Sequence, residues 1–251
     1  MEIVTAAHSD TGKVRTRNED SFICMSGQTN LVNVDAVLVV ADGMGGHAAG
    51  DVASRMAVDH ITEQITNAGT VIDTTNDDSL SQSLEQIIKE ANLEIYESSH
   101  LDNQSGMGTT CTMGVISGTR LFITHVGDSR AYIFKNRELR QLTVDHSWVE
   151  EEVRRGNISR EAASNHPYRN VITRALGLER SVVIDSGLYS LEDRDILLLC
   201  SDGLTTMLDE DQIATVLKNF DLAGAAKELC DQSNNAGGSD NTTVVLAQMI
   251  H

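Results

Sequence analysis

Four apolar segments of this sequence are bounded by an aspartate, and this pattern limits the possible fold more than any other feature. The four aspartates are Asp42, Asp128, Asp202 and Asp240. Short runs rich in Val, Ile and Leu, such as residues 36–41 and 196–200, are typical of strands buried on both faces. A carboxylate at the end of a buried strand loses its hydration unless a cation compensates its charge. We therefore expect the strand ends to converge on bound cations.

The segments between these strands predict paired helices. Apolar residues recur at helical spacing over residues 51–66 and again over residues 80–95, with turn-rich polar sequence at residues 67–78 between them. Further helical patterns cover residues 147–165, 209–218 and 222–232. We expect the first two helices to lie side by side.

Hairpin signals in the middle of the chain indicate antiparallel sheets. Residues 117–119 separate strands at residues 111–117 and 121–126, and residues 135–138 separate strands at residues 131–134 and 139–143. Later strands are expected at residues 182–189, 196–200 and 241–248. Strands grouped together, with helix pairs inserted, favour an α+β sandwich over a doubly wound fold.

Composition excludes several classes of protein. The 37 acidic residues outweigh 19 basic ones, so the formal net charge is -18, which argues against binding to nucleic acid or anionic lipid. The four cysteines form no C-x-x-C pair, which favours reduced thiols in the cytoplasm over a thiolate zinc site. No apolar run approaches the length of a membrane span. We expect a cytoplasmic monomer.

Oxygen ligands without Cys or an H-x-x-H pair favour the hard ions Mg²⁺ and Mn²⁺. Taken singly, each aspartate could equally be a turn residue or a helix cap. The glycine-rich stretch at residues 43–48 also fits a loose dinucleotide pattern, G-x-G-x-x-A. That alternative is weak, because an amphipathic helix occupies the span where the acidic residue of a second strand should lie.

Six motifs in order carry a resemblance to a known family. They are Arg15-Thr-Arg-Asn-Glu-Asp20, Ala41-Asp-Gly-Met-Gly-Gly46, Gly108-Thr-Thr110, Val126-Gly-Asp-Ser-Arg130, Cys200-Ser-Asp-Gly203 and Gly238-Ser-Asp-Asn241. Together they resemble the metal-dependent protein serine/threonine phosphatases of type 2C, in their compact bacterial form. The resemblance covers nearly the whole chain. It implies a four-layer α/β/β/α sandwich formed by residues 1–251 as a single catalytic domain, with a flap at about residues 145–170.

The resemblance also implies a role for each matching residue. Asp42 would bridge two metal ions and the Gly43 carbonyl would bind the second, with no side chain to obstruct it. Asp202 and Asp240 would bind the first ion, and Asp128 would help to hold a weaker third ion. Glu19 and Asp20 would act on the second ion or its waters. Arg15 would bind phosphate, with Arg17 as the local competitor.

The implied reaction is hydrolysis of phosphoserine and phosphothreonine in proteins. Hydroxide bridging Mn²⁺ or Mg²⁺ ions would attack phosphorus in line, without a phosphoenzyme. Met44 stands where many eukaryotic members carry a histidine acid, so the leaving group would be protonated by His47 or by a metal-bound water. His47 fits equally well as a loop residue at the start of the helix. Trp148 could meet substrate or simply pin the flap.

The implied partners are phosphorylated proteins, above all serine/threonine kinases and their substrates. A non-catalytic scaffold that keeps the fold is a second hypothesis, but every metal position is intact. A phosphatase of phosphorylated regulators in sporulation or stress signalling is a third. The lack of a sensor or membrane segment favours general opposition to kinases.

Overall fold

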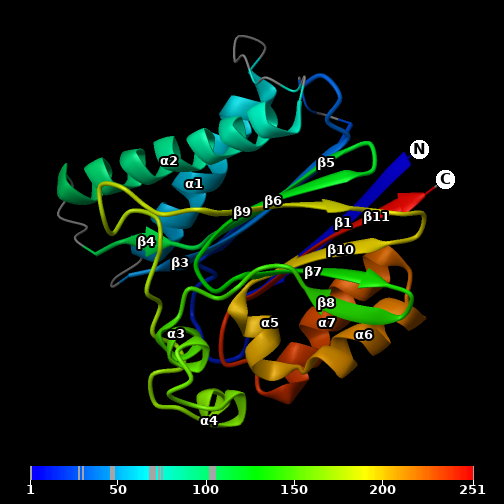
Figure 1. The fold of residues 1–251 in the computed structure, drawn as a ribbon. Helices are drawn as coiled ribbons and strands as arrows, with labels where there is room; N and C mark the ends of the chain where they lie inside the picture. The colour runs from blue at the N-terminus through cyan, green and yellow to red at the C-terminus, as the bar shows by residue number, and fades with distance from the viewer. Residues whose placement is uncertain are drawn as a thin grey trace.

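Two antiparallel β-sheets lie face to face at the centre of the molecule, with helices on both outer sides (Figure 1). The computed structural model describes residues 2–27, 29, 31–45, 49–67, 72, 74, 76–101 and 106–250. The strands of each sheet come from distant parts of the sequence, so strand ends far apart along the chain meet at one end of the sandwich.

The five-stranded sheet has the order β1-β11-β10-β7-β8. Its strands are β1 (Glu2–Asp10), β7 (Arg130–Lys135), β8 (Glu138–Gln141), β10 (Ile196–Cys200) and β11 (Thr242–Ile250). The N-terminal and C-terminal strands pair with each other, with Asp10 opposite Thr242. Asn136 and Arg137 take positive φ in the β7–β8 hairpin, as a tight turn requires.

The six-stranded sheet has the order β2-β3-β5-β6-β9, with β4 paired to β3. Its strands are β2 (Asp20–Ser26), β3 (Ala36–Met44), β4 (Gly108–Thr109), β5 (Cys111–Ser117), β6 (Arg120–Val126) and β9 (Asp185–Ser190). Strands β5 and β6 form the predicted hairpin, in which Gly118 has a φ of 61°.

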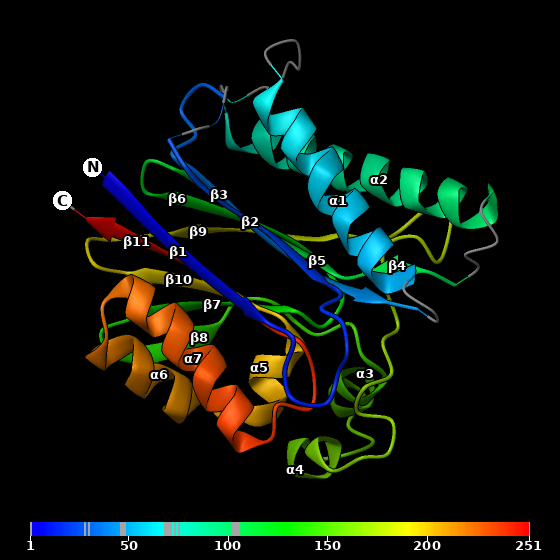
Figure 2. The same ribbon diagram turned by 180° about the vertical axis from the view of Figure 1, so that it is seen from behind.

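Helix pairs cover the two outer faces (Figure 2). Helices α1 (Ala49–Thr66) and α2 (Asp77–Leu101) lie over the six-stranded sheet, whereas α6 (Glu210–Asn219) and α7 (Leu222–Ala236) lie over the other. Three short helices lie near the end where the apolar strands stop: α3 (Trp148–Arg154), α4 (Arg160–Ser164) and α5 (Asp202–Met207).

Three separate hydrophobic cores correspond to the three spaces between these layers. Strand β3 contributes to two of them, because Val37 and Val39 face the helices while Leu38 and Val40 face the other sheet. Strand β10 does the same, with Leu198 toward the helices and Leu197 toward the other sheet. Burial on both faces explains the continuous apolar runs of these strands. The predicted four-layer α+β sandwich is confirmed.

Several elements differ from the sequence prediction. The helical segment expected at residues 147–165 is two helices, because Gly156 takes a φ of 77° between α3 and α4. The prediction missed strands β1, β2 and β4 and helix α5. Strand β1 is only half-buried along its length, so its sequence lacks a clear apolar pattern.

Candidate active site

Carboxylates from both sheets gather at one end of the sandwich. Asp20 begins β2 and lies directly opposite Asp42 in the β2–β3 pairing. Asp202 is the first residue of α5, immediately after β10, and Asp240 lies just before β11. Asp128 lies in the turn between β6 and β7. Negative charge on the other four aspartates raises the pKa of Asp42, so the predicted set is brought together.

Burial and mutual repulsion make these groups unusual acids. Burial is the main cause and neighbouring carboxylates the second, and together they raise the pKa of Asp42 well above its usual value. The same causes raise the pKa of Asp20 to about 7, that of Asp128 to about 8 and that of Asp202 to about 6. A buried cluster of like charges is unfavourable unless positively charged groups neutralise it.

Two carboxylate oxygens in the cluster are buried without a hydrogen-bond partner: Oδ1 of Asp20 and Oδ1 of Asp128. The other oxygen of Asp20 accepts hydrogen bonds from Ser201 Oγ at 2.8 Å and Thr243 Oγ1 at 2.6 Å. Ser201 follows β10 and Thr243 lies in β11, both of the five-stranded sheet, whereas Asp20 begins β2 of the six-stranded sheet. These hydrogen bonds therefore join the two sheets at the site. Buried unpartnered carboxylate oxygens fit the ligand preference of Mg²⁺ and Mn²⁺.

Within the described residues, no three His, Cys, Asp or Glu side chains already form a group that could hold a metal ion. A cation from the chain itself meets part of the negative charge, because the Arg15 guanidinium lies 2.7 Å from Asp240 Oδ2. The carboxylates are therefore neighbours that interact through their charges, without a closed shell of ligands.

Arg15 is a cation in direct contact with the cluster. Its side chain is 51% exposed, and the hydrogen bond to Asp240 raises its pKa. Glu19 also lies close enough for its charge to act on Arg15, and burial raises the pKa of Glu19. The described contacts of Arg17 with the site run through its backbone carbonyl. Of the two candidate arginines, only Arg15 has a described side-chain contact with the carboxylates.

Gly43 is needed for close packing. A Cβ atom there would lie 2.1 Å from the Gly50 carbonyl oxygen and 2.6 Å from that of Glu19. The sequence interpretation gave a different reason, an unobstructed carbonyl for a metal ion. In the structure the missing side chain lets the first turn of α1 approach β3. His47, the other residue predicted in this stretch, lies outside the described residues.

Asn241 is a site residue that the sequence analysis missed. Its Oδ1 accepts a hydrogen bond from the Glu19 backbone N–H at 2.8 Å. Its Nδ2 donates to the carbonyl oxygens of Thr11 and Arg17, each at 2.8 Å. This one side chain thereby fixes the loop that carries Arg15. The sequence feature that could have identified Asn241 is its position directly after Asp240 in the last motif.

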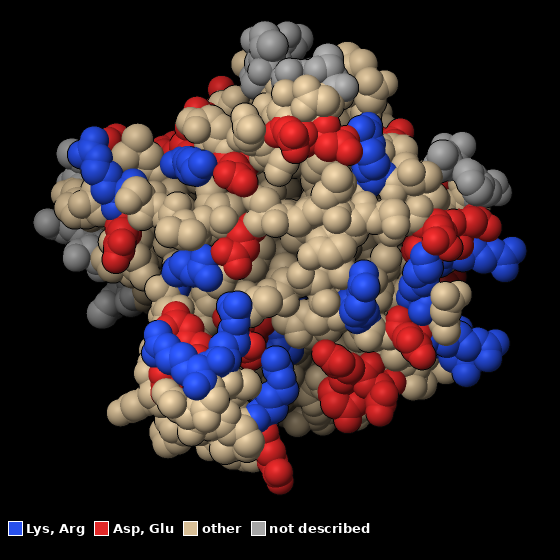
Figure 3. All heavy atoms as spheres, viewed as in Figure 1, with Lys and Arg blue, Asp and Glu red and all other residues tan. Residues whose placement is uncertain are grey.

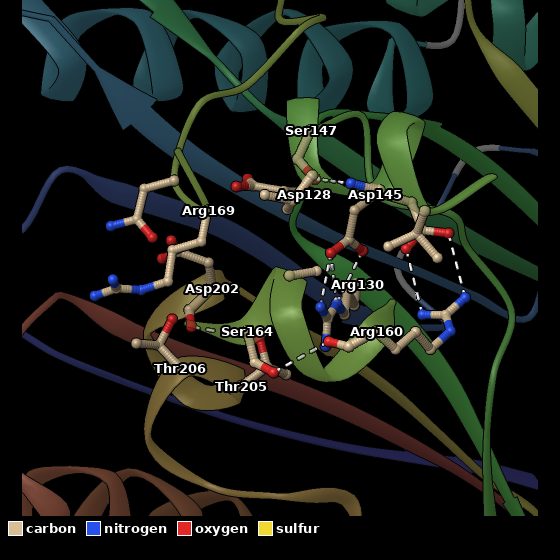
Figure 4. Close-up of a pocket in the computed structure, with 15 residues that line it drawn as sticks. Asp128, Arg130, Asp145, Ser147, Arg160, Ser164, Arg169, Asp202, Thr205 and Thr206 are labelled. Atoms are coloured by element: carbon tan, nitrogen blue, oxygen red, sulfur yellow. Dashed lines mark hydrogen bonds and ion pairs between the residues drawn. The ribbon is translucent and has the colours of Figure 1, made fainter. Parts of the chain in front are cut away.

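A cleft of about 340 Å³ is lined by Asp128, by Asp202 and by residues of the segment at residues 145–170 (Figure 4). Arg130 makes paired hydrogen bonds to Asp145 on its wall, the shortest at 2.7 Å. Arg169 also lines the cleft. Exposed arginines gather over α3 and α4, where Figure 3 shows blue side chains, although the net charge of the chain is strongly negative. These arginines are Arg154, Arg155, Arg160 and Arg169.

Trp148 packs within this segment. Its ring stacks on His166 with centroids 4.8 Å apart and meets Tyr168 edge-on at 5.3 Å. These aromatic contacts join α3 to the returning part of the same segment, so they hold the flap together internally.

Comparisons with known proteins identify the family of this chain. The family model described as "Protein phosphatase 2C" matches residues 8–240. The chain is 40% identical over 243 residues to serine/threonine phosphatase stp of Listeria monocytogenes, covering 96% of this chain and 93% of the relative. The structure of the Streptococcus agalactiae serine/threonine phosphatase aligns with a TM-score of 0.91 at 35% identity, covering 99% of this chain and 100% of that one. The catalytic domain of the phosphatase PstP in complex with two manganese ions aligns with a TM-score of 0.84 at 33% identity, covering 99% of each chain.

Proposed function

The chain belongs to the protein phosphatase 2C family and is a metal-dependent serine/threonine protein phosphatase, and we propose that the carboxylate cluster is its metal centre. Asp42 and the Gly43 carbonyl, with Asp202 and Asp240, hold two Mn²⁺ or Mg²⁺ ions. Asp128 contributes to a third, weaker site. Glu19 and Asp20 act on the second ion or its waters. We also propose that residues 1–251 act as a single catalytic domain with its flap at about residues 145–170.

One observation carries the assignment: buried aspartates from segments distant in the sequence raise one another's pKa values at the end of the sandwich, and two of their oxygens have no partner. The donor set is made of oxygen atoms, which suits hard divalent ions. The related PstP structure with two manganese ions supports the same choice for this chain.

When bound, the ions activate water as the nucleophile and offset charge on the phosphoryl group. Arg15 provides the remaining positive charge. Its half-exposed guanidinium, now on Asp240, presents a planar fork that matches two phosphoryl oxygens. A well-placed donor of this kind is worth roughly 3 kcal/mol in the transition state. Asn241 holds the loop that aims Arg15, and Ser201 and Thr243 hold Asp20.

The substrate is a phosphoserine or phosphothreonine residue within a protein, lying in the cleft beside the flap. Arg169 and the paired Arg130 on the cleft wall favour negatively charged substrate groups. The flap contributes to the choice of peptide. With Met44 in the strand, His47 or a water held by the ions would supply the proton to the leaving group.

We further infer that the enzyme opposes serine/threonine kinases as a cytoplasmic monomer, with no nucleic-acid or membrane partner. The net charge of -18 supports the exclusion of nucleic acid. Four cysteines without disulfides suit a reducing compartment. Among the described residues, no helix has both the length and the apolar character needed to span a bilayer.

The test is hydrolysis of p-nitrophenyl phosphate and of a phosphothreonine peptide with Mn²⁺, with and without a chelator. Both activities should require Mn²⁺, and Asp42→Asn should abolish them while circular dichroism stays native. Asp59→Asn, an exposed change on α1, is the matched control and should retain activity. Full Mn²⁺-dependent activity of Asp42→Asn would reject the assignment.

A further inference from the structure

His146 lies at the root of the flap and is buried, with 2% of its surface exposed. Its backbone N–H donates to the Gly127 carbonyl at 2.7 Å, and its own carbonyl accepts from the Thr173 N–H at 2.8 Å. Gly127 immediately precedes Asp128, and Thr173 lies just after the flap. The residue therefore touches both the turn that carries Asp128 and the returning end of the flap.

The His146 ring makes a second bond to the same turn. Its Nδ1 lies 3.0 Å from the Gly127 backbone nitrogen. A backbone N–H is always a donor, so Nδ1 must be the acceptor and the ring proton must be on Nε2. Nε2 lies 3.2 Å from Asp185 Oδ2, away from the ideal hydrogen-bond direction. Burial lowers the pKa of His146, in agreement with a neutral ring of this tautomer.

The turn at residues 127–129 is also held by Thr110. Gly127 has a φ of 115°, and a Cβ atom there would lie 2.5 Å from Thr110. The hydroxyl of Thr110 lies 2.7 Å from that of Ser129 and accepts a hydrogen bond from the Asp42 backbone N–H at 2.9 Å. Thr110 and His146 thus both contact the turn that carries Asp128.

The two ends of the flap are joined next to His146. Ser147 forms an isolated β-bridge with Ile172, and the Trp148 N–H donates to the Val171 carbonyl at 2.8 Å. Arg174, just beyond, is paired at 2.8 Å with the same Asp185 that faces the His146 ring. The root of the flap is therefore joined to Gly127 through His146.

We propose that His146 is a positioning residue: through the bond from the Gly127 N–H to its Nδ1, it holds the turn at residues 127–129 so that the Asp128 carboxylate faces the carboxylate cluster. The proposal rests on the proposed role of Asp128 at the metal centre. It assigns to a buried histidine outside the carboxylate cluster the task of keeping Asp128 oriented toward it.

Two substitutions separate the functions of the two ring nitrogens. In His146→Asn the amide oxygen replaces Nδ1 and can still accept from Gly127, but nothing reaches Asp185. In His146→Gln the amide group replaces Nε2 and reaches Asp185, but the acceptor for Gly127 is lost. His146→Leu removes both. Asn92→Leu is the control for loss of a buried polar side chain: Asn92 accepts from the Gly177 N–H at 2.9 Å and donates to the carbonyls of Glu179 and Arg180, and none of these bonds involves the turn at residues 127–129.

The measurements are the affinity of each purified chain for Mn²⁺ by calorimetry and the Mn²⁺ concentration that gives half-maximal phosphopeptide hydrolysis. Partners of metal ligands typically change metal affinity at least 10-fold when removed. We expect His146→Gln and His146→Leu to need roughly 10-fold more Mn²⁺ at the weakest site. His146→Asn and Asn92→Leu should stay within about 2-fold of the unmodified chain.

Equal Mn²⁺ affinity in the Asn, Gln and unmodified chains would overturn the proposal. So would losses that simply follow the melting temperature, with Asn92→Leu affected as strongly as His146→Gln. If His146→Leu does not fold, the Asn and Gln variants still decide the question. An unmodified chain that binds no Mn²⁺ would instead refute the proposed metal centre, so the two failures can be told apart.

Discussion

Replacing one of the buried carboxylates should stabilise the metal-free protein while destroying its response to metal. Asp202 is the clearest case, since burial and the charge of Asp240 raise its pKa from 3.8 to about 6. A folded-state pKa above the unfolded value means that the folded chain binds the proton more tightly. The stabilising effect is complete below pH 3.8 and is lost as the pH rises through 6.

The size of this effect follows from the two pKa values. The full difference corresponds to about 3 kcal/mol, of which about 1.4 kcal/mol is lost between pH 5 and pH 8. His125 acts in the opposite sense, because burial lowers its pKa to about 3 and its neutral form is favoured on folding. The pH dependence of the unmodified chain alone therefore mixes opposing contributions, and a comparison with a variant is needed to isolate Asp202.

The assay is urea denaturation of the unmodified chain and Asp202→Asn at pH 5 and pH 8, with a chelator present. The free energy of unfolding of the variant, relative to the unmodified chain, should rise by about 1.4 kcal/mol between the two pH values. Asp59→Asn should show no such rise. Mn²⁺ at 100 times its Kd should then stabilise the unmodified chain by about 2.7 kcal/mol at pH 8 and leave Asp202→Asn almost unaffected. A constant or falling difference between the chains would refute the reasoning.

Three other perturbations test the surroundings of the site. Asn241→Ala leaves the backbone groups of Thr11, Arg17 and Glu19 without their partner. The free energy of unfolding should therefore fall by about 2 kcal/mol, and KM for p-nitrophenyl phosphate should rise. Unchanged values would contradict the role given to the Asn241 side chain. Gly43→Ala places a Cβ atom 2.1 Å from a backbone oxygen, and thermal denaturation with a chelator should show a loss of about 1–3 kcal/mol even without metal. Exchanging residues 145–170 for those of a relative should alter the preference among phosphopeptides, measured as kcat/KM for a panel of them, and an unchanged order would argue against a role of the flap in selection.

The sequence predicted most of the fold because its apolar patterns are strong where elements are buried on one or two faces. Residues 111–117 and 196–200 were predicted with the bounds that the structure has. Helix α5 was missed because it spans only six residues, too few for a helical period. The break between α3 and α4 depends on one glycine with positive φ, which a periodic pattern of charged residues does not reveal.

The aspartates of the site could be predicted because each interrupts an apolar segment, a conflict visible in the sequence itself. The side chains that hold these aspartates in place could not be predicted from the sequence. Ser201 and Thr243 hold Asp20 only because β2 and β11 come from different sheets that meet at this end. Such contacts depend on tertiary packing, which no local pattern of residues encodes.

The site draws its side chains from both halves of the sandwich. Asp20 and Asp42 stand on one sheet, while Asp202 and Asp240 stand at the margins of the other. The gap across which they face one another is therefore set by the thickness of the apolar layer between the sheets, where Leu38 meets neighbours such as Leu197. That layer sets the distance between the two sheets. Adding or removing a methylene group inside the layer therefore changes the distance between the carboxylates of the two sheets, although the altered side chain contacts none of them.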